Sequence, residues 1–298
     1  MDAVSEDGRH ALTLIAFIGS VFSPYYRRAF RRDAQTDPAD HCALNVCLYS
    51  PGARRWTMTE RGRRHVHRDE THLEIGPSAL HWQGDELSIR IQERSLPFGQ
   101  RVQGHIRLQA PVLTRYAAAL DAAGRHRWRP LAPTAQLVVE LDQPRLQWRG
   151  RAYLDSNEGD EPIDQGFERW DWVRATARDG RTTVIYDTTP RHGPGCVLAH
   201  QFAPDGSDSE LEAPPPLPLG ATRWWRVQRQ LRAAPSAEGQ QALVRQTLED
   251  TPFYARSLIH LPSHHSQPMD VVHETLDAQR LRQPLVQWML PFRMPRRS

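Results

Sequence analysis

The amino-acid sequence predicts a mainly β protein with two barrel or sandwich domains and few helices. Three observations support this prediction. The chain has 298 residues, enough for about two domains. Hydrophobic side chains recur at every second position in many short segments, which is the period of a half-buried strand. Glycine, proline, aspartate and asparagine separate these segments, as expected for turns between strands.

The predicted strands follow one another along the whole chain. Residues 11–18 are apolar enough to form a strand buried on both faces. In the next clear pair, Leu87 to Ile91 and Val102 to Leu108, apolar and polar residues alternate, so each strand has one buried face. Further β-rich segments are residues 44–49, 135–141, 171–177, 182–186 and 223–229.

Helical and irregular segments are few. Residues 240–248 and 277–290 have some helical spacing, and Pro284 interrupts the second segment. Residues 203–220 are acidic and contain three consecutive prolines, so we expect a stiff surface loop. The predicted junction lies near Gly150, which gives an N-terminal β domain of residues 1–150 and a C-terminal β domain of residues 151–298.

Composition excludes several classes of protein. The net charge of +3 is too small to indicate nucleic-acid binding, although all 38 basic residues are arginine. Without lysine there is neither a phosphate-loop lysine nor a Schiff base. The three cysteines form no paired framework, which favours a reducing compartment. The apolar run 11–22 is too short to span a membrane and follows an acidic segment, so we expect a cytoplasmic protein without a signal peptide.

Two histidine groups are candidates for a metal site. His65 and His67 precede Glu70 but lie among arginines, which repel a cation. His260, His264 and His265 lie in a proline- and serine-rich segment that does not fix their geometry. We therefore expect surface or structural roles for both groups and no metal.

The densest set of chemically useful residues runs from residue 124 to residue 172. His126 and Trp128 alternate, as do Tyr153 and Asp155, so each pair shares one face if its segment is a strand. An acid, an imidazole, a phenol and an indole would then line one pocket. The alternative is that the aromatic residues belong to the core and that Asp155 begins a turn.

Several long strings carry a resemblance to a known family. They are DGRHAL at residues 7–12, GSVFSPYY at 19–26, RHRWRP at 125–130, YLDSN at 153–157, LEDTPFYARS at 248–257 and MLPFRMPR at 289–296. With these strings the sequence resembles the carotenoid 1,2-hydratase family, also called hydroxyneurosporene synthases. The resemblance covers nearly the whole chain, except residues 203–220 and 260–267.

The resemblance implies a bacterial lyase that adds water to the terminal C-1,2 double bond of acyclic carotenoids such as neurosporene and lycopene. The product is a 1-hydroxy carotenoid, and no organic cofactor is needed. The implied fold is a pair of lipocalin-like β-barrel or β-sandwich domains, which agrees with the alternation and the length.

The resemblance also supplies candidate roles. An alkene is a very weak base, so the proton donor must be an uncharged acid, which apolar surroundings favour. We expect Asp155 to protonate C-2. Trp128 would face the cation at C-1, with Tyr153, Trp170 or Trp172 as further candidates for that role. His126 would either bond to Asp155 or position and deprotonate the attacking water. Trp170, Trp172 and Tyr254 are candidate substrate-binding residues, and Glu249 and Asp250 are competing acids.

A carotenoid dissolves only in lipid, so the implied enzyme would meet it at a membrane. Phe22, Tyr25 and Tyr26 precede Arg27 and Arg28, a combination typical of an interfacial segment. We therefore expect peripheral association with the cytoplasmic face of the inner or photosynthetic membrane, with ordinary packing of these aromatic residues as the alternative. Two other functions stay open: a non-catalytic carotenoid or lipid carrier, and a cyclase or isomerase acting through a similar cation.

Overall fold

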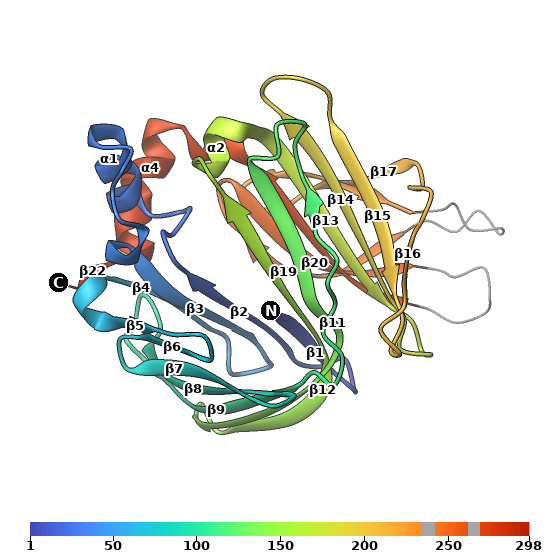
Figure 1. The fold of residues 1–298 in the computed structure, drawn as a ribbon, viewed down its shortest axis with the longest axis horizontal. Helices are drawn as coiled ribbons and strands as arrows, with labels where there is room; N and C mark the ends of the chain where they lie inside the picture. Colours follow the sequence, from blue (N-terminus) through green and yellow to red (C-terminus); the bar gives the residue numbers. More distant parts are fainter. Residues whose placement is uncertain (234–241, 262–268, 298) are drawn as a thin grey trace. The chain divides into compact units, whose positions relative to one another are not determined.

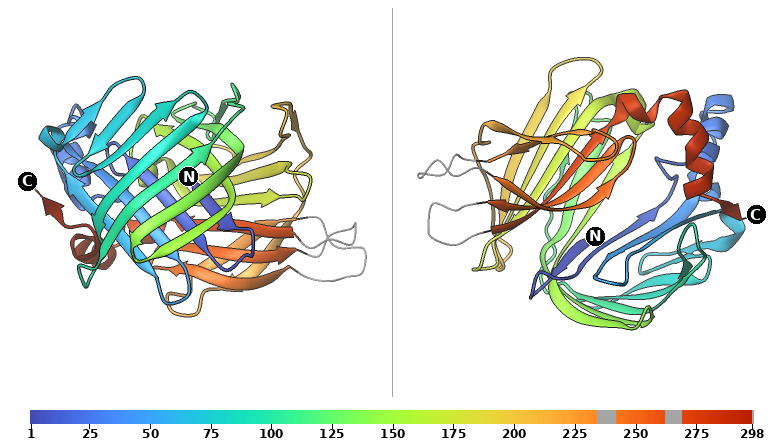
Figure 2. Two further views of the ribbon diagram at one scale, coloured as in Figure 1. Left: turned by 90° about the horizontal axis from the view of Figure 1, so that it is seen from below. Right: turned by 180° about the vertical axis from the view of Figure 1, so that it is seen from behind.

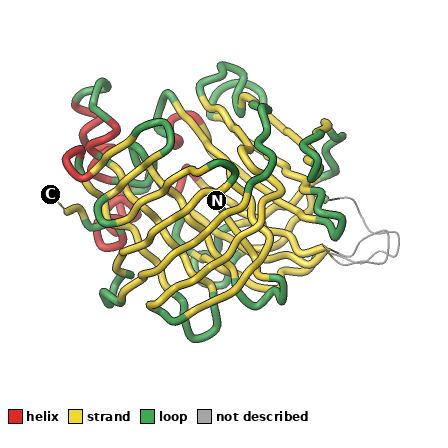
Figure 3. The backbone as a smooth tube through the Cα atoms, turned by 60° about the horizontal axis from the view of Figure 1, so that its bottom comes forward, coloured by secondary structure: helices red, strands yellow, loops and turns green. Residues whose placement is uncertain are grey.

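The computed structural model describes residues 1–233, 242–261 and 269–297 (Figure 1). The chain divides into two compact units. Unit 1 comprises Met1–Thr114, Pro130–Asp155 and Gln287–Ser298, and unit 2 comprises Arg115–Arg129 and Ser156–Val286. The predicted junction at Gly150 falls inside strand β12 (Leu146–Gly159), and the units are each assembled from separate chain segments. Strands dominate the described backbone, so the mainly β prediction is confirmed (Figure 3).

Unit 1 is built on one large antiparallel sheet with a single parallel pair at its edge. Its order is β22-β4-β3-β2-β1-β12-β11-β9-β8-β7-β6-β5, and Figure 2 shows that it curls strongly. The remaining strand bounds are β1 (Asp2–Ser5), β2 (Ala11–Phe17), β3 (Cys42–Tyr49), β4 (Arg55–Arg61), β5 (Val66–Arg68), β6 (His72–Ile75), β7 (Ser78–Gln83), β8 (Glu86–Arg94), β9 (Arg101–Gln109), β11 (His126–Gln143) and β22 (Arg296–Arg297).

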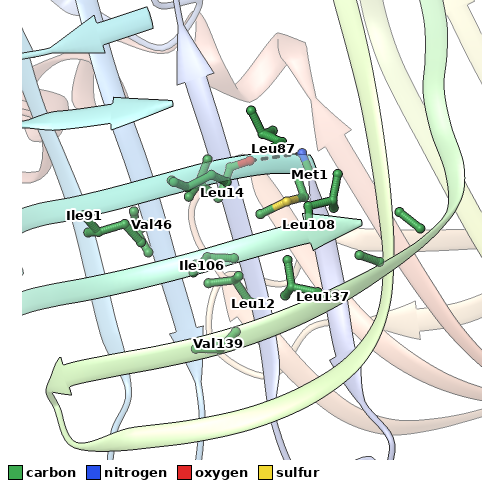
Figure 4. Packing of buried hydrophobic residues seen from close by; sticks show 14 of the residues in the cluster. Met1, Leu12, Leu14, Val46, Leu87, Ile91, Ile106, Leu108, Leu137 and Val139 are labelled. Carbon is green, nitrogen blue, oxygen red and sulfur yellow. Dashed lines mark hydrogen bonds between the residues drawn. The ribbon is translucent and has the colours of Figure 1, made fainter. Parts of the chain in front are cut away.

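The core of unit 1 lies on the concave face of this sheet. Alternate residues of β8, β9 and β11 point inward, as the period-two pattern predicts. Figure 4 shows them meeting Leu12 and Leu14 of β2 and Val46 of β3. The predicted strand at residues 11–18 is confirmed as β2, and its first four residues are buried.

Two helices belong wholly or partly to unit 1. α1 (Pro24–Arg32) begins at Ser23, whose hydroxyl accepts the Tyr26 amide, and its last turn carries two arginines that suit the negative end of the helix dipole. α4 (Pro284–Arg293) contributes its last residues to unit 1, where the Arg293 guanidinium lies 4.3 Å from the Trp56 ring centroid. Two short 3-10 turns, η1 (Pro38–Asp40) and η2 (Arg63–His65), complete the unit.

The C-terminal strand closes the edge of the unit 1 sheet around a buried charge. β22 runs parallel to β4, with Arg296 opposite Glu60. The Glu60 side chain is fully buried, and its Oε1 bonds to Arg296 Nη1 and lies 2.8 Å from His41 Nδ1. A buried carboxylate needs such partners because the interior does not solvate charge.

Unit 2 contains a second antiparallel sheet in the order β16-β15-β14-β13-β21-β20-β19. A separate ribbon of β17 and β18 packs on it through Leu231 and Ala233, which join a core with Val173, Ile185 and Ile259. The bounds are β10 (Ala118–Ala119), α2 (Ile163–Gly166), β13 (Phe167–Thr176), β14 (Thr182–Pro190), β15 (Cys196–Phe202), β16 (Asp208–Glu210), β17 (Pro216–Ala221), β18 (Gln228–Arg232), β19 (Leu243–Asp250), β20 (Tyr254–Leu261), β21 (Met269–Asp277) and α3 (Ala278–Leu281).

Three local predictions need correction. The helical spacing at residues 240–248 is wrong for its described part, because Leu243–Asp250 forms strand β19. The β-rich segment 223–229 is mostly a turn before β18 begins at Gln228. The acidic segment 203–220 contains the short exposed strand β16 and most of β17 in addition to loop. The break at Pro284 is confirmed, since α3 ends at Leu281 and α4 begins at Pro284.

Among the described residues, no helix has the length and apolar character to cross a bilayer.

Candidate active site

An aromatic cluster in unit 2 is centred on Trp128. The indole is fully buried near the start of β11. Its ring centroid lies 5.0 Å from that of Tyr186 on β14, and Tyr186 lies 5.2 Å from Trp170 on β13. Both pairs are tilted or edge-on, so ring faces and ring edges alternate through the cluster.

The cluster continues on both sides of Trp128. Tyr116 lies 5.7 Å from Trp128 and 4.0 Å from the buried His200. On the other side of Trp128, the ring centroid of Phe167 lies 5.5 Å from that of Trp170 and 4.6 Å from that of His126. The faces of such rings carry negative potential and attract a cation, so this buried cluster in unit 2 is chemically suited to a positive charge that develops beside it on an apolar molecule.

His126 is held by Asp121 rather than by a residue of the predicted set. Its Nδ1 lies 2.9 Å from Asp121 Oδ2 within unit 2. The same carboxylate accepts the backbone amides of Ala123 at 2.8 Å, Arg125 at 3.3 Å and His126 at 2.8 Å. Burial acts to raise the pKa of Asp121, but these hydrogen bonds outweigh it and hold the pKa below its ordinary value. Asp121 is therefore a carboxylate that keeps the Nδ1 proton on the imidazole.

Two glycines make room for the His126 ring. A Cβ on Gly166, at the end of α2, would lie 2.4 Å from His126 Cε1. A Cβ on Gly159, at the end of β12, would lie 3.0 Å from His126 Cδ2. Real Cβ atoms essentially never approach closer than 3.0 Å, so Gly166 admits only glycine unless the imidazole moves, and a Cβ at Gly159 would require a shift of a few tenths of an ångström.

The second ring nitrogen of His126 faces no described hydrogen-bond partner. Nε2 is buried, and no polar atom of the described residues lies within bonding distance of it. With the proton on Nδ1 donated to Asp121, Nε2 carries a lone pair. A buried acceptor without a protein partner is suited to holding a water molecule and taking a proton from it.

Tyr153 and Asp155 lie in unit 1 on β12. Tyr153 is buried, and its hydroxyl donates to Asp155 Oδ2 at 3.2 Å. The two residues alternate along the strand, so they share one face, as the sequence predicts. The turn predicted as the alternative at residues 155–157 does not form, because β12 continues to Gly159.

The remaining predicted residues have separate environments. Trp172 is buried on β13 opposite Tyr186 in the strand ladder. Tyr254 is half-buried on β20 and accepts a hydrogen bond from Arg256 Nε at 3.2 Å. Asp250 accepts backbone amides of residues 224 and 225, which gives this competing acid a structural role.

Of the histidines considered as metal ligands, His264 and His265 lie outside the described residues. His67 is exposed and pairs with Asp69, and no group of three or more His, Cys, Asp or Glu side chains within the described ranges is placed to hold a metal ion.

Sequence reasoning missed Asp121, Tyr116 and Tyr186. An aspartate two residues before an amide that its side chain accepts is a turn signal, and Asp121 precedes Ala123 at this spacing, with Gly124 next in the chain. Tyr186 ended a correctly predicted strand, but nothing in the sequence indicated that β14 lies beside Trp128. That proximity depends on long-range pairing.

Comparison with known proteins places the chain in a family. The family model described as carotenoid hydratase CrtC matches residues 14–298. A protein of Rubrivivax gelatinosus named acyclic carotenoid 1,2-hydratase is 51% identical over 299 residues, covering 100% of this chain and 72% of the relative. A protein of the same name from Cereibacter sphaeroides is 38% identical and covers 95% of this chain and 98% of the relative.

A solved structure supports the fold. The crystal structure of a protein described as a candidate AttH from Nitrosomonas europaea matches with a TM-score of 0.60 at 12% identity, covering 93% of this chain and 90% of that one. This likeness concerns the fold alone and agrees with the lipocalin-like prediction. With the family model covering residues 14–298 and relatives sharing up to 51% of its sequence, the chain belongs to the carotenoid hydratase family.

Proposed function

We propose that this chain is an acyclic carotenoid 1,2-hydratase, which adds water across the terminal C-1,2 double bond to give a 1-hydroxy carotenoid. Relatives with this name share 37–51% of their residues with it over at least 95% of its length. The observation that carries the proposal at the chemical level is the His126–Asp121 pair beside an aromatic cluster, since it combines a proton acceptor with rings suited to a cation.

Asp155 is the proposed acid. It transfers a proton to C-2, and the electron pair of the double bond forms the new C–H bond, which leaves C-1 as a tertiary cation. The Tyr153 hydroxyl, 3.2 Å from Asp155 Oδ2, then stabilises the carboxylate that remains. Tyr153 thus assists the acid by favouring the state that follows proton transfer.

Trp128, Tyr186 and Trp170 are the proposed stabilisers of the cation. Ring faces within about 6 Å of a cation contribute up to about 2 kcal/mol each when water is excluded. Trp128 and Tyr186 are fully buried, which meets that condition. Because the charge exists only after protonation, this attraction lowers the barrier rather than binding the substrate more tightly.

His126 is the proposed base. A water molecule on Nε2 attacks C-1, its oxygen forms the new C–O bond, and its proton passes to Nε2. Asp121 stabilises the imidazolium through the 2.9 Å contact to Nδ1. Return of that proton through solvent to the Asp155 carboxylate restores the starting state, so the sum of the steps is the addition of one water molecule.

The test is hydration of lycopene or neurosporene by the purified chain in detergent, in water labelled with ¹⁸O. Mass spectrometry is expected to show one labelled hydroxyl per hydrated end. Asp155→Asn should lower turnover by roughly 10²- to 10⁴-fold, the usual contribution of a general acid. Asp179→Asn, an exposed aspartate that pairs with Arg181, is the control and should keep full activity.

The outcomes separate the alternatives. Binding of several acyclic carotenoids without any labelled product would indicate a carrier. A product of changed skeleton that contains no ¹⁸O would indicate a cyclase or isomerase. Full turnover by folded Asp155→Asn protein would remove Asp155 from the role of acid.

Peripheral association with the cytoplasmic face of a membrane is part of the proposal, because the substrate of such an enzyme resides in lipid. α1 supports it through charge, with Arg28, Arg31 and Arg32 exposed. The aromatic residues of this segment are partly packed instead, as Tyr26 lies 4.9 Å from His41. Flotation with anionic liposomes checks the association, and protein found entirely in the soluble fraction would contradict it.

A further inference from the structure

The turn between β17 and β18 displays two exposed tryptophans between two exposed arginines. Trp224 is 76% exposed and Trp225 is 40% exposed. Arg223 and Arg226 flank them and are exposed as well, and the Arg223 guanidinium lies 5.3 Å from the Trp224 ring centroid. Tryptophan is normally among the well-buried residues, so adjacent exposed indoles indicate a surface that is covered by something else.

The turn is held rigidly by side chains from other strands of unit 2. The Asp250 carboxylate accepts the amide of Trp224 at 2.8 Å and that of Trp225 at 3.3 Å. Arg280 donates to the carbonyl of Trp225 at 2.6 Å and to that of Arg226 at 3.2 Å. Both sides of the turn are therefore fixed by charged groups, and Arg280 itself pairs with Asp277 at 3.3 Å.

Backbone strain is retained at this turn. Arg226 has a φ of +56° and is the only residue other than glycine with a positive φ in the part of the chain that the structure describes. Such a conformation is unfavourable for a side chain with a Cβ and persists where surrounding contacts enforce it. The hydrogen bonds of Asp250 and Arg280 are those contacts, and they hold the indoles outward in one arrangement.

We propose that this turn, residues 222–227, anchors the protein to an anionic lipid surface. Tryptophan prefers the headgroup level of a bilayer, where its ring is apolar and its N–H meets polar groups. Arginine binds lipid phosphate, and the turn carries two exposed arginines, Arg223 and Arg226, and no acidic residue of its own. A preformed turn loses little conformational entropy on insertion.

The choice of a lipid surface as partner rests on the proposed peripheral association, and the inference adds the element that makes the contact. It differs from the segment of aromatic residues predicted at residues 22–28, whose rings are partly packed against the unit 1 core.

The test compares flotation of the native chain with that of the double variant Trp224→Ser/Trp225→Ser. Vesicles contain phosphatidylcholine alone or with phosphatidylglycerol. The native chain should float with the anionic vesicles, and the double variant should lose at least tenfold in partition coefficient. Phe98→Ser is the matched control, because Phe98 is 84% exposed at another site and should not alter flotation.

A second variant tests whether the fixed conformation of the turn contributes to lipid binding. Asp250→Asn keeps both indoles but weakens the acceptor of their amides, so flotation should fall between those of the native chain and the double variant. The unfolding temperature and the hydratase activity in detergent micelles should stay at native values for the double variant, which removes misfolding as an explanation.

Three results would overturn the inference while leaving the hydratase proposal intact. Equal flotation of native chain and double variant would place the lipid contact elsewhere. A smaller sedimenting species for the double variant, with flotation unchanged, would make the turn a contact between two copies of the chain. If the native chain fails to float at all, both the association and the anchor are wrong, and the detergent assay still reports independently on hydration.

Discussion

At the scale of single residues, the most informative feature is the pairing of His126 with Asp121. The carboxylate accepts three backbone amides as well as the imidazole, so it is fixed before it orients the ring. An orienting carboxylate determines which ring nitrogen carries the proton. Nε2 is left as the acceptor, which is the form that a base for water requires.

Replacing Asp121 tests this orienting role. Asp121→Asn should lower kcat by ~10²-fold with little change in KM, because the base loses its orientation while the substrate contacts stay. The control is Asp160→Asn, which removes an exposed carboxylate that pairs with Arg127. A change in KM alone would mean that Asp121 shapes the binding surface and does not act through His126.

The lowered pKa of Asp121 also predicts how the stability of the protein changes in acid. Because its pKa in the folded state lies below the ordinary value of 3.8, its contribution to stability is complete above that value and is lost as the pH falls through the folded-state pKa. The unfolding temperature of the native chain should therefore drop more between pH 6 and pH 3 than that of Asp121→Asn. Parallel curves for the two proteins would contradict this assignment.

Gly166 gives a prediction that depends on steric contact with the His126 ring rather than on charge. In Gly166→Ala the new Cβ would lie 2.4 Å from His126 Cε1, so the imidazole must move and kcat should fall by about tenfold or more. Gly62→Ala is the control, because there the nearest atoms are 3.6 Å away. Hydration kinetics and unfolding temperatures of both variants measure the effect, and equal activities would show that the ring is not confined by Gly166.

At the scale of single elements, strand β22 depends on one buried ion pair. Arg296→Met should lower the free energy of unfolding by about 2–3 kcal/mol. The expected loss is smaller than the loss caused by leaving a buried charge with no partner at all, because His41 still contacts Glu60. Arg297→Met, at the neighbouring exposed position, should change it by less than about 0.5 kcal/mol. Urea unfolding of both variants checks the difference, and equal losses would show that Glu60 does not need Arg296.

Elements were predictable where the chain is regular. β8 and β9 keep strict alternation along their whole lengths, so both their existence and their buried faces follow from the sequence. β19 has two register irregularities, one between Val244 and Gln246 and one between Thr247 and Glu249. Each extra residue shifts the alternation by one position, so the apolar residues imitate a helical spacing.

The turn at residues 222–227 failed prediction for a different reason. Two tryptophans favour a strand locally, but hydrogen bonds from Asp250 and Arg280 impose a turn. In the candidate site, likewise, the alternation of His126 with Trp128 was visible in the sequence. The partners Tyr186 and Phe167 come from β14 and β13, and only the long-range pairing of strands brings them there.

At the scale of the whole molecule, the two units share their chain segments. β11 and β12 each pass from one unit into the other, at residues 129–130 and 155–156. We therefore expect one cooperative unfolding transition, because neither unit can lose these strands alone. Tryptophan fluorescence and far-UV circular dichroism should give the same urea midpoint, and Arg296→Met should lower both midpoints equally. Two separate transitions would contradict this expectation.

The closure of the unit 1 sheet has a consequence for synthesis on the ribosome. The buried Glu60 carboxylate of β4 contacts His41 of its own sheet edge, but its arginine partner, Arg296, is 236 residues further along the chain. While the intervening residues are being translated, the β4 edge of the sheet is open and its carboxylate must remain hydrated. The edge of the N-terminal sheet, although it is synthesised early, is therefore among the last parts of the protein to complete its strand pairing.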